Sequence, residues 1–354
     1  MILTALLLTA AAFAVETIPS PAPVTAHEWG TFTSIADRNG DPVRWFALGG
    51  PAKLPCFVHT FRSKNMYTFV RMETPVIYFY APRKTTLSVS VNFVKGLLSE
   101  WYPAAHDESS RLTWDNVQVL PGENLTFPGG GEGNHYYTAR ATDAAPLRIG
   151  NEQEKMIFYR GVGDIEVPIR PRFTAEGRIE VRSTSPQPIP AAIVFENRGG
   201  NVGYRTLRDL RGAATVEPPE LTANAGAVRM ALAADLVQAG LFPKEAQAMI
   251  ETWRDSWFEP GVRVIYIVPR AAVDAALPLT ITPAASDVAR VFVGRVEMMS
   301  PAMIEEIELG VKHGDRALLA EYGRFLEGFW QGLHGYNAKL SPGLAAQWIG
   351  GCDH

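Results

Sequence analysis

The residues best suited to chemistry are histidines that lie beside carboxylates in a segment rich in short apolar stretches. His27 precedes Glu28, His106 precedes Asp107, and His135 follows a glycine-rich stretch. Imidazole and carboxylate groups that converge from separate loops form open divalent-metal sites, where the metal acidifies water or polarises a carbonyl. We therefore expect His27, His106 and His135 to bind zinc or copper. Glu28 or Asp107 would orient or deprotonate a water.

The spacing of these residues leaves other interpretations open. The sequence has no H-E-x-x-H motif, and a strand through residues 27–30 would place His27 and Glu28 on opposite faces. Structural histidines held by hydrogen bonds are the alternative. If signal peptidase cuts after Ala26, His27 becomes the first residue, and its amino group and ring would chelate copper as in lytic polysaccharide monooxygenases. His106 or His135 would then supply the second imidazole.

Two Glu-Trp pairs suggest a different function, in which indole rings stack on sugar rings. They are Glu28–Trp29 and Glu100–Trp101. Trp29 and Trp101 would contact the glycan or another small-molecule substrate, and a carboxylate pair would act as acid and base. The alternative is that the tryptophans fill the core. No G-x-S-x-G motif is present, so a non-catalytic envelope scaffold or binding module is a third hypothesis.

The two cysteines, Cys56 and Cys352, lie at opposite ends of the chain. In an oxidising compartment an even pair favours a disulfide, which would join the C-terminal tail to the N-terminal region. The spacings Cys56-x-x-His59 and Cys352-x-His354 also suit zinc, and unpaired thiols are the remaining alternative.

The N-terminal segment indicates that the protein is exported from the cell. Residues 2–14 form an uncharged apolar run of signal-peptide length, although no Lys or Arg precedes Arg38. Cleavage would follow Ala14 or Ala26, and residues 19–23 form a Pro-rich spacer. We expect no transmembrane segment after cleavage. A net charge of -4 argues against nucleic-acid binding.

Residues 27–214 are predicted to form an antiparallel, β-sandwich-like domain that follows the signal peptide and spacer of residues 1–26. Apolar and polar residues alternate through 87–93, which indicates a strand with one buried face. Similar short runs, separated by turn residues, occur at 76–80, 156–160, 165–169, 179–182 and 192–196, with a hairpin at 197–201.

Residues 215–354 are predicted to form a mixed α/β portion that ends in helices and packs on the first domain. Helices are expected at 227–239 and from Pro243, and strands at 262–268, 279–282 and 288–297. Ser300 and Pro301 would begin a helix that ends at Gly314, and Asp315 would cap one that continues through Leu333.

Five segments resemble a group of uncharacterised exported bacterial proteins. They are H-E-W-G-T-F-T-S at 27–34, R-M-E-T-P-V-I-Y-F-Y at 71–80, E-W-Y-P-A-A at 100–105, F-Y-R-G-V-G at 158–163 and V-F-V-G-R at 291–295. The resemblance implies bacterial export, to the periplasm or to the medium. It also suggests that H-E-W-G and E-W-Y-P-A-A lie at one functional or structural centre.

Overall fold

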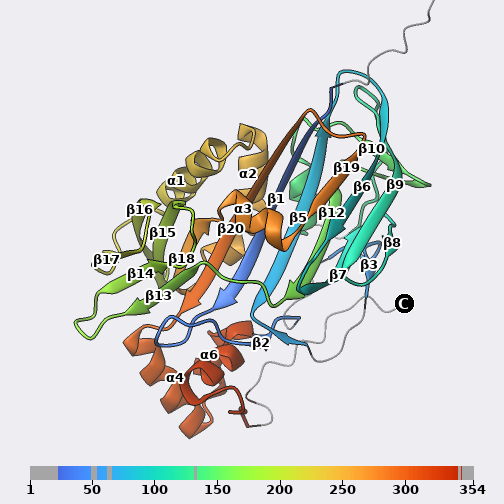
Figure 1. The fold of residues 1–354 in the computed structure, drawn as a ribbon. Coiled ribbons are helices and arrows are strands. Elements are labelled where there is room, and N and C mark those ends of the chain that lie inside the picture. The colour runs from blue at the N-terminus through green and yellow to red at the C-terminus, as the bar shows by residue number, and fades with distance from the viewer. Residues whose placement is uncertain (1–22, 49–53, 62–65, 131–133, 342–343, 345–354) are drawn as a thin grey trace, which may run out of the picture.

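A nine-stranded sheet runs through the centre of the molecule (Figure 1). The computed structural model describes residues 23–48, 54–61, 66–130, 134–341 and 344. In spatial order, the strands of the central sheet are β16 (Asn201–Leu210), β15 (Ile189–Arg198), β18 (Gly261–Ile267), β20 (Asp287–Met298), β1 (Thr25–Ile35), β5 (Val70–Tyr80), β12 (Ile157–Gly163), β7 (Gly96–Tyr102) and β3 (His59–Thr60).

The C-terminal portion of the chain supplies two strands to the middle of this sheet. β18 and β20 lie between β15 and β1. β20 runs parallel to β1 and aligns Asp287 with Thr25, while the other neighbouring strands of the sheet are antiparallel. The segments before and after the predicted boundary at residue 214 therefore build one sheet, because strands from both complete it.

Two smaller sheets cover one face of the central sheet. The first contains β11 (Glu152–Glu154), β10 (Leu147–Ile149), β9 (Arg111–Val119), β6 (Thr85–Asn92) and β19 (Leu279–Thr282), with β8 (His106–Asp107) beside β9. The second contains β13 (Ile169–Phe173), β14 (Ile179–Ser183) and β17 (Ala213–Val216). One apolar core, which includes Phe79, Trp114 and Val181, joins the layers. The predicted β-rich, sandwich-like architecture is confirmed.

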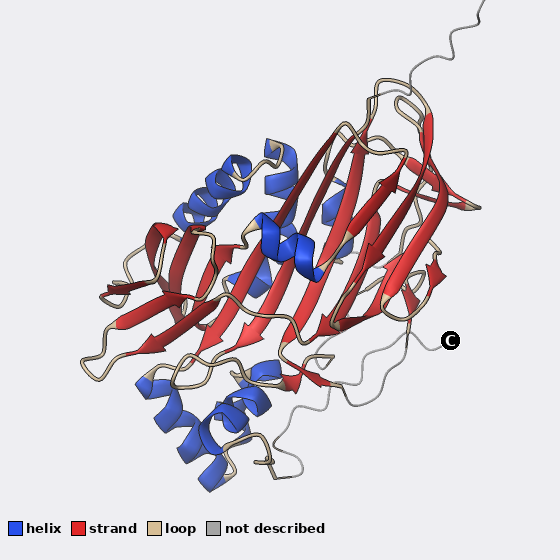
Figure 2. Ribbon diagram, viewed as in Figure 1, coloured by secondary structure: helices blue, strands red, loops and turns tan. Residues whose placement is uncertain are grey.

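Helices cover the opposite face of the central sheet (Figure 2). They are α1 (Ala225–Gln238), α2 (Pro243–Trp257) and the short 3₁₀ helix η1 (His135–Arg140). Gly240 ends the first helix with a φ of 119°, and Pro243 begins the second, as predicted. No helix in the described part of the chain has both the length and the apolar character that a membrane crossing requires.

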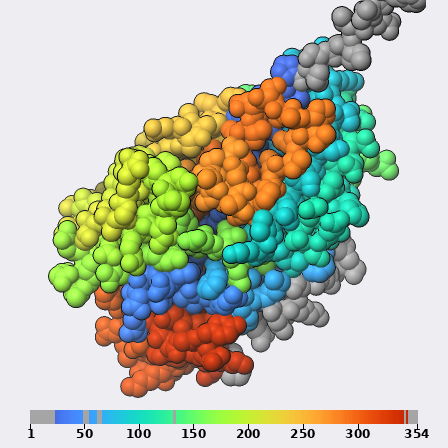
Figure 3. Space-filling view, viewed as in Figure 1, coloured from blue at the N-terminus to red at the C-terminus, as the bar shows by residue number. Residues whose placement is uncertain are grey.

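The C-terminal helices pack against one end of the central sheet, beside the N-terminal segment drawn in blue (Figure 3). They are α4 (Pro301–His313), α5 (Arg316–Ala320), η2 (Gly323–Phe325) and α6 (Leu326–His334), and they lie near the small pair β2 (Trp45–Phe46) and β4 (Tyr67–Thr68). Ser300 and Asp315 cap α4 and α5 as predicted. The long helix predicted after Asp315 is wrong, because Gly323 has a φ of 50° and interrupts it.

Most of the other predicted elements are present, with one strand misplaced. The hairpin at 197–201 joins β15 and β16 through Gly199 and Gly200, whose φ angles are 58° and 85°. The strand predicted at 165–169 is wrong: Ile165 and Val167 are buried, but this stretch is a connection, and β13 begins at Ile169. Helix α3 (Arg270–Ala276), between β18 and β19, was not predicted.

Candidate functional site

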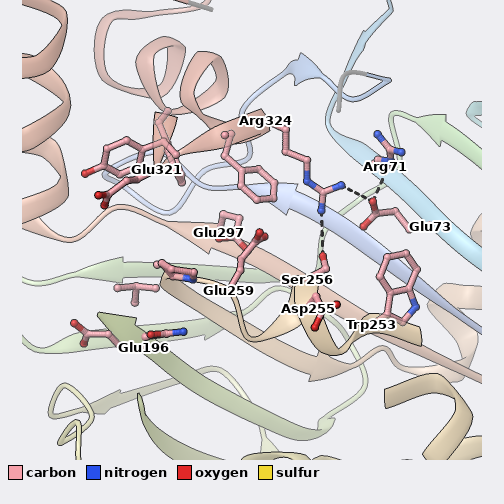
Figure 4. Close-up of a pocket in the computed structure, with 18 of the residues that line it drawn as sticks. Arg71, Glu73, Glu196, Trp253, Asp255, Ser256, Glu259, Glu297, Glu321 and Arg324 are labelled. Atoms are coloured by element: carbon pink, nitrogen blue, oxygen red, sulfur yellow. Dashed lines mark hydrogen bonds and ion pairs between the residues drawn. The ribbon is translucent and has the colours of Figure 1, made fainter. Parts of the chain in front are cut away.

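A cavity of about 360 Å³ opens where the central sheet meets the end of α2 and the C-terminal helices (Figure 4). β5, β12, α2 and η2 supply much of its wall. Its charged and hydrogen-bonding residues include Arg71, Glu73, Thr74, His135, Arg160, Asp255, Ser256, Glu259 and Arg324. Its aromatic residues include Tyr136, Phe158, Trp253 and Phe325. The cavity thus combines apolar surface with converging polar groups, as ligand sites do.

Glu73 is a buried carboxylate between two arginines. It is 2% exposed, and its Oε1 lies 3.0 Å from Arg71 Nε and 2.6 Å from Arg324 Nη1 (Figure 4). Thr33 Oγ1 donates a hydrogen bond of 2.7 Å to its Oε2. Burial alone would raise the pKa of Glu73, but the two guanidinium groups outweigh it and hold the pKa well below its usual range. Glu73 is therefore ionised at neutral pH.

Arg160, on β12, brings a third guanidinium group to the same region of the wall. Its Nε and Nη2 donate to Thr74 Oγ1 over 3.3 and 3.1 Å. Within the described residues, no carboxylate oxygen lies within 4.0 Å of its nitrogens. Burial lowers the pKa of Arg160 to about 10, and repulsion from Arg71 contributes to the decrease. The group is still protonated at neutral pH.

A β-bulge places Thr74 in this wall. The pairing of β1 with β5 shifts between Trp29 and Thr31, and Thr74 has a φ of 47°, which a β-branched residue rarely adopts. Gly30 permits the bulge, because a Cβ there would come within 2.7 Å of the Phe292 ring. Adjacent residues of a regular strand point to opposite faces. At the bulge, both Glu73 and its neighbour Thr74 line the cavity.

A second ion-pair cluster fixes the segment after α2. Arg263 Nε lies 2.9 Å from Glu297 Oε1, and its other nitrogens donate to the carbonyl oxygens of residues 257, 259 and 260. Arg295 pairs with Glu297 and Glu259 and donates to Ser256 Oγ over 2.7 Å. These bonds hold Ser256 and Glu259 at the cavity wall.

His135 is the one predicted metal ligand that lines the cavity in the described structure. It begins η1, whose N-cap Asn134 accepts a hydrogen bond from the Tyr136 backbone. Its Nε2 lies 3.1 Å from Asp255 Oδ2, near the end of α2. His135 thus brings an imidazole ring to the cavity wall beside the Asp255 carboxylate.

His27 lies on the helix-covered face of the sheet, where it anchors α2. Its Nδ1 is 2.7 Å from Glu245 Oε2, and both residues are buried. Tyr80 donates its hydroxyl to Glu245 Oε1 over 2.7 Å, and the Phe242 ring centroid is 4.4 Å from that of His27. In this structure His27 is therefore a buried histidine held by hydrogen bonding, which was the alternative to metal binding.

Glu28 and Trp29 are also completely buried. Glu28 accepts hydrogen bonds from Arg290 Nε over 2.5 Å and from the Tyr159 hydroxyl, which lies in the core between the sheets. Trp29 belongs to the other core, under the helices. His27 and Glu28 therefore lie on opposite faces of the sheet, as predicted, and Trp29 lies on the same face as His27. In this structure Glu28 has no route to a substrate, and Trp29 has no free indole face.

The remaining predicted residues lie away from the cavity. His106 is exposed on β8, with its Nε2 3.7 Å from Glu108 Oε1, and Asp107 accepts a 2.6 Å hydrogen bond from the Ser109 backbone. Trp101 is 8% exposed on β7 and stacks on the His59 ring. The structure therefore does not bring His27, His106 and His135 together.

No three His, Cys, Asp or Glu side chains form a metal-holding group within the part of the chain that the structure describes. Zinc or copper binding stays a prediction, which elemental analysis of the purified protein would test. Cys352 and His354 lie outside the described residues, so the bridge between Cys56 and Cys352 also stays a prediction.

The cavity residues that sequence reasoning missed are charged residues inside buried strands. Arg71, Glu73 and Arg160 lie on β5 and β12, and Arg295, on β20, bonds to the wall residues Ser256 and Glu259. Their sequence signal was the interruption of apolar runs by charge in R-M-E-T-P, F-Y-R-G-V-G and V-F-V-G-R. Charge inside a buried strand requires a partner or a ligand. The five segments that resemble exported bacterial proteins lie on or directly follow five consecutive strands, β20, β1, β5, β12 and β7.

No model of a known protein family matches the sequence, and no curated protein matches it. Two solved structures similar to the chain are of the yeast delta-COP-I mu-homology domain. One has 8% sequence identity and a TM-score of 0.27; the other, complexed with Dsl1 WxWxV peptide, has 6% identity and a TM-score of 0.29. Each covers 80% of this chain and 98% of the other. These likenesses are too weak to support an argument about function.

Proposed function

We propose that this chain is an exported bacterial protein that binds a small polar organic molecule in the cavity at the end of the central sheet. The apolar run at 2–14 supports export. The observation that supports binding is the convergence of Arg71, Glu73 and Arg160 from two neighbouring strands on a cavity of about 360 Å³. A cavity of this volume accommodates a small metabolite.

The cost of burying these groups supports a functional role for them. Each charged side chain taken out of water destabilises the fold by several kcal/mol unless its partners compensate. Arg71 and Arg324 share the carboxylate of Glu73, whereas Arg160 is hydrogen-bonded to a hydroxyl. A stable fold does not require this arrangement, and a ligand that completes the hydrogen bonds accounts for it.

A carbohydrate remains the second candidate, now at the cavity rather than at the Glu-Trp pairs. Tyr136, Phe158 and Trp253 provide aromatic surface, and Asp255 and Glu259 provide acceptors for hydroxyl groups. A scaffold without a ligand is the remaining alternative.

Thermal unfolding with a panel of sugars, sugar acids, amino acids and small carboxylic acids tests the proposal. A bound compound raises the melting temperature in a saturable way. Ala302→Trp, which places an indole at the cavity wall, should abolish the rise, whereas Ala175→Trp on an exposed turn should not. A panel without effect on the wild type, or equal effects on both variants, would contradict binding in the cavity.

A further inference from the structure

We propose that Arg160 recognises a single anionic group, a carboxylate or a phosphate, on an otherwise uncharged or cationic organic ligand. This inference rests on the proposed function and adds the chemical class of the ligand.

The charges at this end of the cavity favour an anion. The Glu73 carboxylate is bound by the guanidinium groups of Arg71 and Arg324, and the Arg160 guanidinium group lines the same wall without contacting it. Glu100 pairs with Arg160 across β7 and β12 in strand register and attracts it electrostatically, but it bonds to Ser99. Arginine guanidinium groups bind carboxylate and phosphate oxygens with short, charge-assisted hydrogen bonds.

The donors of Arg160 are incompletely used. Two of its nitrogens share one acceptor, Thr74 Oγ1, and within the described residues Nη1 has no hydrogen-bond acceptor. A guanidinium group has five N–H donors in one plane. An anion that approaches the open edge would receive paired hydrogen bonds from these donors.

The position of Arg160 is fixed before a ligand arrives. Its guanidinium carbon lies 5.6 Å from the centre of the Phe158 ring, and Thr74 is held in its left-handed conformation beside it. Backbone strain of this kind clusters at sites where a side chain must be held in place for binding. A preorganised donor loses less conformational entropy when it binds.

Other wall residues limit which chemical groups the rest of the ligand can carry. Trp253 lines the cavity and offers aromatic surface to the body of the ligand. Asp255 and Glu259 also line the cavity, and their charges disfavour a second anionic group. The geometry thus suits one anionic group on a body that carries hydroxyl or amino groups.

Calorimetric titration with D-glucuronate, D-glucose and citrate tests this inference. The wild type should bind glucuronate at least roughly 10-fold more tightly than glucose, because one charge-assisted contact contributes that much. Citrate, with its additional charges, should bind more weakly than glucuronate. Arg160→Gln should remove the preference for glucuronate over glucose, Arg160→Lys should keep part of it, and Arg182→Gln, at an exposed position of β14, should leave it unchanged.

The outcomes separate this inference from the proposed function. Equal binding of glucose and glucuronate by the wild type, or a preference that survives in Arg160→Gln, would overturn anion recognition and leave the cavity as a binding site. No binding of any compound at millimolar concentration would contradict both. If Arg160→Gln fails to fold, as circular dichroism would show, a full wild-type preference in Arg160→Lys would overturn the role of its paired donors.

Discussion

At the scale of single residues, the cavity depends on charge that is buried and mutually compensated. Glu73 is the carboxylate shared by Arg71 and Arg324. Removing its charge would take a shared partner from two largely buried guanidinium groups, and breaking a buried ion pair is among the most destabilising changes known. Glu73 therefore has a structural role beneath the proposed anion site, and Arg160 has the role of recognition.

Glu73→Gln should lower the free energy of unfolding at pH 7 by about 3 kcal/mol. The folded-state pKa of Glu73 is below its ordinary value, so its stabilisation is complete above the unfolded pKa and is lost as pH falls towards the folded pKa. The difference between wild type and variant should therefore be smaller at pH 3 than at pH 7. Urea unfolding at both pH values measures it.

Glu217→Gln is the control for this prediction, because Glu217 is exposed and pairs with exposed Arg178. It should change stability by less than about 0.5 kcal/mol at either pH. An equal loss for Glu73→Gln at pH 3 and pH 7 would contradict the ionised buried carboxylate.

The sequence predicted His135 as a candidate residue but could not predict its neighbours at the cavity. His135 meets Asp255 because η1 packs beside α2, a tertiary contact that local spacing does not contain. Arg71 and Arg160 were missed for a similar reason: they follow the strand pattern locally, and the bulge at Thr74 gives them their environment. His27, which has the most suggestive neighbours in the sequence, is a packed structural residue.

At the scale of elements, α2 is attached to the sheet by hydrogen bonds at both ends. His27 and Tyr80 bind Glu245 near its start, and the Arg263 side chain binds the carbonyls of its last residue, Trp257, and of Glu259 beyond it. The helix carries Trp253, Asp255 and Ser256. Its attachment therefore determines the shape of the cavity.

Glu245→Ala should destabilise the protein by about 3 kcal/mol, because His27, Tyr80 and the Phe242 backbone N–H would each lose a buried partner. Chemical unfolding of the variant beside Glu251→Ala, a more exposed residue of the same helix, measures this. A Glu245→Ala protein as stable as the Glu251→Ala protein would refute the role of Glu245 as an anchor.

Elements with a clear local signal were predictable. The caps Ser300 and Asp315, Gly240 and the Gly199–Gly200 turn act through the backbone of their immediate neighbours. The errors at 165–169 and after Asp315 occur where local apolar spacing suits one element while the tertiary partner or a left-handed glycine requires another.

At the scale of the whole molecule, the fold is one central sheet that both ends of the sequence complete. Composition and alternation predicted the layered β-rich architecture, but the parallel pairing of β1 with β20 joins residues that no local pattern connects. The consequence is a cavity whose wall contains residues from Leu54 to Phe329.

A fragment of residues 27–214 should therefore fail to fold on its own. It lacks β18 and β20, so β1 would lose a neighbour and β15 would be separated from the rest of the sheet. We expect no cooperative thermal transition for the fragment and a single transition for the full chain. A fragment with a sharp transition and dispersed amide resonances would show that the N-terminal portion is an independent domain.

The central claim is that an anion-bearing small molecule occupies the cavity beside Arg160. The most direct measurement is a crystal structure of the protein with D-glucuronate, or with the strongest compound of the panel. We expect the ligand's anionic group within hydrogen-bond distance of the Arg160 guanidinium and its body against Trp253. A ligand bound at another surface, or in the cavity with its anionic group turned away from Arg160, would contradict the account.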